Sequence, residues 1–255
     1  MPDASPLSSL PTTLLILSIA TFALAGVVKG VVGLGLPTVA MAVLALAMTP
    51  ADAAALLVVP SLVTNFWQMR PWPAMWPLLR RLLPMQAGVV AGTLFGAWLL
   101  GAPAGAWARA ALGVALLGYA AWSLLGSVRP VAPRTERWLG PLTGAITGIV
   151  TAATGVFAVP AVPYLQALGL PRAALMQAMG LSFSVSTAAL ALGLQANGRF
   201  PTAALGLSLV MLAPALLGML AGQWLGQRLS PAVFRRCFLL SMAALGLYMV
   251  LRELI

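Results

Sequence analysis

The stretch Gly26-Val-Val-Lys-Gly-Val-Val-Gly-Leu-Gly-Leu-Pro37 is the most informative part of this 255-residue chain, because the chain repeats it. Its echo is Gly144-Ala-Ile-Thr-Gly-Ile-Val-Thr-Ala-Ala-Thr-Gly155, in which the first two glycines recur at the same spacing. Such an echo indicates an internal duplication. In an apolar chain, duplicated halves are typical of transporters whose binding site lies between the repeats. The two stretches therefore predict a membrane transporter built from two copies of one unit.

A second pattern also recurs, and it consists of small residues four positions apart. Pro84 is followed by Gly88, Gly92 and Gly96, and the series recurs as Pro214, Gly218, Gly222 and Gly226. Residues at this spacing share one face of a helix, where glycines let two helix backbones approach closely. We interpret both series as helix-packing faces rather than ligand contacts. Such faces are also compatible with a homodimer.

The composition places the chain in a membrane. Hydrophobic residues make up 61% of it and charged residues only 7%, too few to cover the surface of a water-soluble domain. The net charge of +10 comes from arginines in separate loops between apolar runs, which is typical of cytosolic anchors and not of a continuous nucleic-acid-binding face. The expected fold is an all-α polytopic integral membrane protein that binds no nucleic acid.

The same composition excludes most catalytic and metal sites. The chain has no histidine and one cysteine, Cys237. A zinc site would therefore lack its usual ligands, and a Ser-His or Cys-His nucleophile pair cannot form. We expect no enzyme activity, no metal and no cofactor.

Ten apolar segments can be marked along the chain. We predict segments 12–33, 36–48, 52–68, 82–101 and 104–126 in the first half, and 139–154, 157–169, 172–194, 203–227 and 232–252 in the second. The chain then divides into an N-terminal tail (1–11), a first membrane repeat (12–126), a cytosolic linker (127–138) and a second membrane repeat (139–255). The second segment of each half is too short to cross a hydrocarbon core about 30 Å thick as a helix.

Each short segment follows a break in the helical pattern. The residues that could line a site there are Gly33 and Gly35 in the first half, and Thr151, Thr154 and Gly155 in the second. Interrupted helices at matching places in two halves point to a binding site, because their free backbone groups must face protein or a wet cavity. The helix N-termini after the two breaks would direct backbone amides towards an anion. Close helix packing through glycine is the other explanation and stays open.

Two membrane arrangements fit the ten segments. If each short segment and its predecessor make one crossing, each half has four crossings and the repeats are parallel (4+4). If both cross, each half has five and the repeats are inverted. The positive-inside rule favours the inverted repeats, because they place most arginines with the linker in the cytosol and both termini outside. Lys29 then lies near the cytosolic end of its apolar run, from which its ammonium could snorkel to the surface.

The first glycine-rich stretch, 26–37, resembles the signature of the TauE/SafE sulfite-exporter family, and the echo from Gly144 to Pro160 has the matching place in the second half. Length and duplicated architecture agree, so the resemblance covers nearly the whole chain. It implies a multi-pass transporter of the bacterial inner membrane that moves sulfite, sulfonates or related sulfur-containing anions outward. Its partners would be a small anionic substrate and the lipid bilayer.

Two arginines at equivalent places are the predicted anion contacts. Arg70 follows the third segment and Arg199 follows the eighth, so inverted repeats would place them at opposite membrane faces. A guanidinium offers forked N–H donors that match the oxygens of sulfonate, sulfite or carboxylate. Asn65, Gln68 and Ser184 are predicted to extend the polar lining. The alternative is that the arginines are interfacial anchors, with neighbouring tryptophans in the aromatic belt.

The few acidic residues bear on how transport would be driven. Asp3 and Glu253 are terminal, Glu136 lies in the linker and Asp52 begins the third segment, so carboxylates for a proton or sodium relay are almost absent. A cytosol-negative potential contributes about 2.3 kcal/mol per charge per 100 mV and drives anions outward without a coupling ion. We therefore predict transport that responds to potential more than to pH. The alternative function is a non-transporting membrane assembly or scaffold subunit.

Overall fold

The structure is a computed structural model that describes residues 11–126, 130–200, 202–228 and 230–254. The first half holds α1 (Thr12–Val32), α2 (Leu36–Leu44), α3 (Pro50–Gln68), the 3-10 turn η2 (Trp72–Ala74), α4 (Met75–Leu100) and α5 (Gly105–Leu125). The second half holds α6 (Pro133–Thr154), α7 (Ala161–Ala167), α8 (Arg172–Ala196), α9 (Thr202–Gly226) and α10 (Pro231–Leu254). No strand occurs within these ranges, and the predicted all-α fold is confirmed. Most of the predicted tail and the start of the predicted linker lie outside them.

Six of the helices are long and apolar enough to cross a membrane: α1, α4, α5, α8, α9 and α10. Over the described ranges, α3 and α6 have 19 and 22 residues but are not apolar enough to join this group. Most of the α3 residues are buried against other helices, and α6 begins with a charged turn. A helix that faces protein rather than lipid can carry polar side chains. The chain is therefore a polytopic membrane protein with a polar interior helix.

Two helices begin earlier than the apolar segments predict. α4 starts at Met75 and α6 starts at Pro133, so the second part of the predicted linker is helical. The early part of α4 is joined to the first turn of α6 by an ion pair in which Arg81 Nε lies 2.8 Å from Glu136 Oε1. Hydropathy marks only the part of a helix that suits lipid, and a charged turn continues the helix beyond it.

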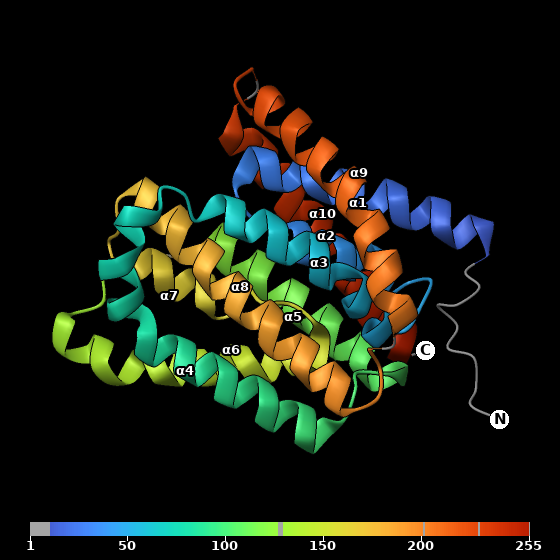
Figure 1. Cartoon of the computed structure of the whole chain (residues 1–255), viewed down its shortest axis with the longest axis horizontal. Coiled ribbons are helices and arrows are strands. Elements are labelled where there is room, and N and C mark those ends of the chain that lie inside the picture. Colours follow the sequence, from blue (N-terminus) through green and yellow to red (C-terminus); the bar gives the residue numbers. More distant parts are fainter. Residues whose placement is uncertain (1–10, 127–129, 201, 229, 255) are drawn as a thin grey trace.

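The glycine faces hold helices of opposite halves together. α1 packs along α9, and α6 packs along α4 in the equivalent way (Figure 1). A Cβ atom added at Gly26 would collide with the carbonyl oxygen of Ala215, and one added at Gly144 would collide with that of Met85. Gly218 and Gly88, from the second glycine pattern, meet Ala23 and Pro141 in the same manner. The prediction that both glycine series pack helices is confirmed.

Equivalent helices of the two halves run antiparallel where they meet. The end of α3 lies beside the start of α8, since Gln177 Nε2 donates to the carbonyl oxygen of Met69 at 3.1 Å. The start of α3 lies beside the end of α8, where Arg199 Nη2 is 3.8 Å from Asp52 Oδ1. α5 and α10 are antiparallel too, with the start of α5 joined to the end of α10 by the Arg109–Glu253 ion pair. This is the relation expected between inverted copies.

The helix bundle thus has two ends, which we name by their contents. The "Asp52 end" holds the starts of α3 and α5 and the ends of α8 and α10. The "linker end" holds the ends of α1 and α3 and the starts of α6 and α8. In Figure 1 the start of α1 and the end of α10 lie at the right, and the start of α6 lies at the left.

The two short helices make up only part of a crossing. α2 has 9 residues and α7 has 7, so each covers about 10–14 Å at 1.5 Å per residue. The chain between α1 and α3 nevertheless passes from the linker end to the Asp52 end, with turns on either side of α2. The chain of the first half thereby changes ends at α2, as the inverted arrangement predicts. The number of membrane crossings per half, and the choice between inverted and 4+4 repeats, stay predictions. The membrane faces of the two ends stay a prediction.

Glycine permits the breaks before both short helices. Gly33 ends α1 with φ +81° and donates its N–H to the carbonyl oxygen of Lys29 at 2.8 Å, and Gly35 follows with φ +124°. Gly155 ends α6 in the same way, with φ +70° and a bond to the carbonyl oxygen of Thr151 at 2.8 Å. A residue with a Cβ atom rarely adopts these positive φ angles.

Candidate functional site

The ammonium group of Lys29 is buried inside the bundle, so the predicted snorkelling is wrong. Lys29 is only 3% exposed, and its Nζ donates to Thr64 Oγ1 at 3.0 Å and to Asn65 Oδ1. Snorkelling needs a path along an open helix face, whereas here α3 lies against that face of α1 and offers oxygen acceptors. The acceptors on α3 therefore hold the side chain inside the protein.

No carboxylate within the described ranges pairs with Lys29. The ion pairs found there are Arg81–Glu136, Arg109–Glu253 and Arg199–Asp52. A buried charge without a counter-charge is costly, and an ionisable residue inside a membrane bundle is by default a candidate functional residue. Lys29 is therefore the strongest candidate for binding an anion.

A proline in α3 organises the residues that meet Lys29. Pro60 lacks an N–H, so the carbonyl oxygen of Leu56 loses its helical donor and instead accepts the Ser208 hydroxyl of α9 at 2.8 Å. The same hydroxyl accepts the Val59 N–H at 3.0 Å. The Thr64 hydroxyl in turn donates to the carbonyl oxygen of Pro60 at 2.7 Å. The first turn after the proline is thereby fixed with its oxygens towards α1.

The polar contacts continue from α3 to α8. Asn65 Nδ2 donates to Ser61 Oγ at 3.1 Å, and Ser61 Oγ lies 3.0 Å from Thr187 Oγ1. All of these side chains are buried. We call Lys29, Ser61, Thr64, Asn65 and Thr187 the "Lys29 cluster". It joins three helices, α1 and α3 of the first half and α8 of the second, at the seam that the repeats predict.

Further buried polar groups on α4 and α8 have no hydrogen-bond partner within the described ranges. They are both side-chain amide atoms of Gln86 and the hydroxyls of Thr93, Ser182 and Ser186. Ser182 and Ser186 are one helical turn apart and so share a face of α8. Buried polar groups are normally paired, so unpaired ones call for an explanation such as a bound polar molecule. These uncharged groups extend the polar interior of the bundle towards α4.

The two predicted arginines lie at opposite ends of the α3–α8 pair, and neither contacts the Lys29 cluster. Arg70 is exposed at the linker end, with its guanidinium carbon 4.3 Å from the centre of the Trp67 ring. Arg199 lies at the Asp52 end, where it contacts Asp52 and lies 3.5 Å from Thr49 Oγ1. Stacking on a belt tryptophan suits the interfacial-anchor interpretation of Arg70. Their contact with substrate stays a prediction.

Among the predicted lining residues, Asn65 alone belongs to the Lys29 cluster. Gln68 lies one turn further along α3, where its Nε2 donates to the carbonyl oxygen of Met176 at 3.0 Å while its Oε1 is buried without a partner. The Ser184 hydroxyl donates to the carbonyl oxygen of Gly180 at 2.8 Å. Gln68 is thus held between the cluster and the linker end, whereas the Ser184 hydroxyl bonds within its own helix.

The residues predicted at the two breaks are used differently. Thr154 Oγ1 donates to the carbonyl oxygen of Val150 at 2.7 Å and accepts the Val156 N–H at 3.2 Å, and Thr151 Oγ1 lies 3.4 Å from the Val156 carbonyl oxygen. These hydroxyls stabilise the turn before α7, and Gly155 lies against Met41 of α2. Gly33 instead lies against Met176 of α8, beside the residues that hold Gln68.

The Lys29 cluster was visible in the sequence only in part. Lys29 is the single lysine of the chain and stands inside an apolar run between two packing glycines. That position was a usable signal, since a lysine in the middle of a membrane helix is rare. Its contacts with Thr64 and Asn65 depend on which face of α3 meets α1, and the sequence alone does not give this.

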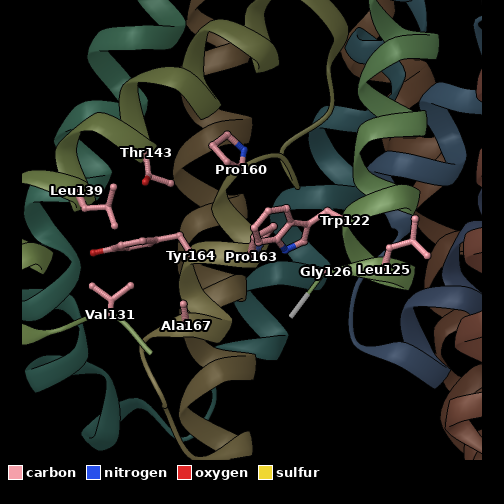
Figure 2. Close-up of a pocket in the computed structure, with 10 residues that line it drawn as sticks. All are labelled: Trp122, Leu125, Gly126, Val131, Leu139, Thr143, Pro160, Pro163, Tyr164 and Ala167. Carbon is pink, nitrogen blue, oxygen red and sulfur yellow. The ribbon is translucent and has the colours of Figure 1, made fainter. Parts of the chain in front are cut away.

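The larger cavities lie elsewhere and carry no charge. One of about 620 Å³ lies between α5, α6 and α7, where the Tyr164 ring extends between Leu139 and Val131 and Trp122 lies next to Pro163 (Figure 2). Another, of about 710 Å³, occupies the equivalent place between α10, α1 and α2. No charged side chain lines either of them, so neither offers an anion a counter-charge. The described residues also contain no group of three His, Cys, Asp or Glu side chains that could hold a metal.

Comparison with known proteins gives one match. A family model described as sulfite exporter TauE/SafE matches residues 18–249, which is nearly the whole chain. No curated protein and no solved structure matches the chain. The resemblance that the glycine-rich stretches predict is confirmed.

Proposed function

Since the chain belongs to the sulfite exporter TauE/SafE family, we propose that it exports small sulfur-containing anions, such as sulfite or sulfonates, across the bacterial inner membrane. The family and the six candidate spans make it a multi-pass protein of a membrane-transporter family. One observation carries the more specific proposal. The buried ammonium of Lys29 has neutral oxygen partners and no carboxylate within the described ranges.

Lys29 suits an anion by its donors as well as its charge. An ammonium has three N–H donors, and Thr64 and Asn65 accept two of them. An oxyanion that accepts the third would also neutralise the charge, in an interior where charge–charge attraction is much stronger than in water. The lysine is a point charge that does not require a particular oxygen geometry, so it accommodates both a pyramidal sulfite and a tetrahedral sulfonate.

We retain the two arginines as contacts at the mouths of the path. Arg70 lies at the linker end and Arg199 at the Asp52 end, on either side of Lys29. Arg70 has no ion-pair partner within the described ranges, and Arg199 shares its charge with Asp52. An anion would thus meet a guanidinium, the buried ammonium and a second guanidinium in turn.

The membrane potential supplies the driving force in this proposal. With the cytosol negative, an anion gains about 2.3 kcal/mol per charge per 100 mV by leaving the cell. None of the hydrogen-bonded neighbours of Lys29 is a carboxylate that could carry a proton or sodium ion along. Export therefore follows the potential rather than a pH gradient.

The test is efflux from proteoliposomes loaded with radiolabelled sulfite, sulfoacetate or thiosulfate, under potentials set with valinomycin. We expect potential-dependent efflux from the parent protein, and loss of most of it in Lys29→Gln, which keeps a donor but removes the charge. Thr147→Val, at the equivalent place in the second half, is the matched control and should retain efflux. Arg70→Ala and Arg199→Ala test the two mouths in the same assay.

Two results would contradict the proposal. Efflux that follows pH but ignores the potential would remove the proposed driving force. A folded parent protein that moves none of the three anions would instead favour the alternative function, a non-transporting membrane assembly or scaffold subunit.

A further inference from the structure

A separate cavity of about 360 Å³ lies at the linker end of the bundle, between the end of α1 and the starts of α8 and α10. Its polar lining consists of the side chains of Arg172, Arg235 and Gln166. The rest of its wall is apolar and comes from Val31, Val32, Leu34, Leu175, Met176, Met179 and Ala232. We call it the "Arg172 cavity".

The Arg172 cavity is positively charged. Neither Arg172 nor Arg235 forms an ion pair within the described ranges, and no acidic residue lines the cavity. Two guanidinium groups on an apolar wall concentrate anions, because a cleft lined by one sign of charge focuses the field. Each also offers forked donors that match the oxygens of sulfur oxyanions.

The Arg172 cavity shares elements with the Lys29 cluster. Val31 and Val32 line the cavity and belong to the last turn of α1, directly after Lys29. Met176 also lines it, packs against Gly33, and holds Gln68 through its carbonyl oxygen at 3.0 Å. Gln68 in turn lies one turn along α3 from Thr64 and Asn65. The Oε1 of Gln68 is buried and has no hydrogen-bond partner within the described ranges.

We propose that the Arg172 cavity is a second anion site, which binds a small oxyanion at Arg172 and Arg235 before it passes Gln68 to reach Lys29. Its role as the loading site rests on the proposed export function, but its ability to bind an anion does not. The cavity thereby adds a positive site at the linker end, in addition to the Arg70 mouth of the proposed path.

Arginines are common at the cytosolic ends of membrane helices, where they act as anchors. The test therefore needs a control arginine at the same end that does not line the cavity. Arg236 follows Arg235 on α10, is exposed, and does not line the cavity. An anchor role would make Arg235→Gln and Arg236→Gln equivalent. A site in the cavity predicts an effect for Arg235→Gln and none for Arg236→Gln.

The experiment measures local charge by cysteine labelling in detergent micelles, where both ends of the protein are accessible. Ala232→Cys places a thiol on the cavity wall, in a Cys237→Ala background that removes the natural cysteine. The thiol is reacted with an anionic and a cationic methanethiosulfonate reagent of similar size. Inorganic sulfate, which does not consume the reagents, serves as the competing oxyanion.

We expect the anionic reagent to react about tenfold faster than the cationic one, relative to a free thiol, and sulfate to slow it. Arg235→Gln should bring the ratio towards that of the free thiol, and Arg172→Gln with Arg235→Gln should reach it and abolish the sulfate effect. Arg236→Gln should leave both unchanged. A ratio that survives the double substitution, or a lack of protection by sulfate, would overturn the proposal. The readout needs no transport, so failure of the export function would not produce either result.

Discussion

Positions 29 and 147 occupy equivalent places on α1 and α6, each beside glycines that pack in the same way on a helix of the other half. One carries a lysine and the other a threonine. Lys29 bonds across to α3, whereas the Thr147 hydroxyl turns back to the carbonyl oxygen of Thr143 in its own helix, at 2.8 Å. The two halves therefore share their helix packing but not their charge. A symmetric helix bundle can thus carry a charged group in one half alone.

The equivalent helices α3 and α8 also differ, in how their polar side chains are paired. Ser61 and Asn65 of α3 bond to each other, to Lys29 and to Thr187. Counted from the proline at the start of each helix, Ser182 and Ser186 of α8 correspond to Ser61 and Asn65 of α3. The hydroxyls of Ser182 and Ser186 have no partner within the described ranges. The first half therefore holds a connected, charged network and the second half a neutral polar surface.

The largest expected effect comes from making position 29 like position 147. Lys29→Thr removes a charge-assisted interaction with the transported anion worth about 2–3 kcal/mol, so efflux should fall about 30- to 150-fold. The measurement is initial efflux of radiolabelled sulfite from proteoliposomes at a fixed potential. Equal efflux from parent and variant would show that the charge is not used.

The shared packing can be tested by adding one methyl group to each copy. In Gly30→Ala and Gly148→Ala the new Cβ would meet the backbones of α9 and α4, so both variants should lose about 1–3 kcal/mol of unfolding free energy. Gly118→Ala is the control, because nothing lies within 4 Å of that position. Thermal unfolding in detergent measures all three. A loss confined to one of the two packing glycines would break the equivalence of the two helix crossings.

A further variant moves the positive charge to the other half of the protein. Thr147→Lys added to Lys29→Thr places the ammonium on α6, where the unpartnered hydroxyls of α8 and Thr93 of α4 offer acceptors. We expect recovery of about tenfold of the lost efflux, which corresponds to about 1.4 kcal/mol. The same sulfite assay reads it. No recovery in a folded double variant would mean that the neutral half cannot replace the charged one.

The smallest effect is expected at the two ends of the α3–α8 pair. Arg199 is 40% exposed and its contact with Asp52 is long, so Asp52→Asn should cost less than about 1 kcal/mol of unfolding free energy. Arg70→Gln breaks no ion pair within the described ranges and should cost less still. Thermal unfolding of the two variants side by side gives the comparison, and a larger loss for Arg70→Gln would reverse it.

Much of the fold could be predicted from periodic features of the sequence. Ten apolar segments became ten helices, and the glycine series became helix contacts, because both features depend on spacing along one helix. The early starts of α4 and α6 were missed, since the Arg81–Glu136 pair that extends them is a contact between distant parts of the chain. Hydropathy contains no information about such a contact.

Only part of the Lys29 cluster can be predicted from the sequence. Asn65 is predicted as a lining residue because polar residues of an apolar segment are marked locally, and the structure places it in the cluster. The sequence analysis predicts Arg70 and Arg199 as the anion contacts, which stays a prediction, and it does not predict that Lys29 is buried. A lysine near a helix end can direct its ammonium either to water or to acceptors inside the protein. Which of the two occurs here depends on the face that α3 presents to α1.

The exchange of helices between the halves has a consequence for how the protein is made. α1 finds its partner in α9, and α4 finds its partner in α6, so neither half can complete its own contacts. During synthesis α1 leaves the ribosome long before α9. The glycine face of α1 therefore stays unpaired in the lipid until nearly the whole chain has been inserted. A chain that stops in the linker would leave that face open, and quality-control proteases could tell an unfinished molecule from a finished one.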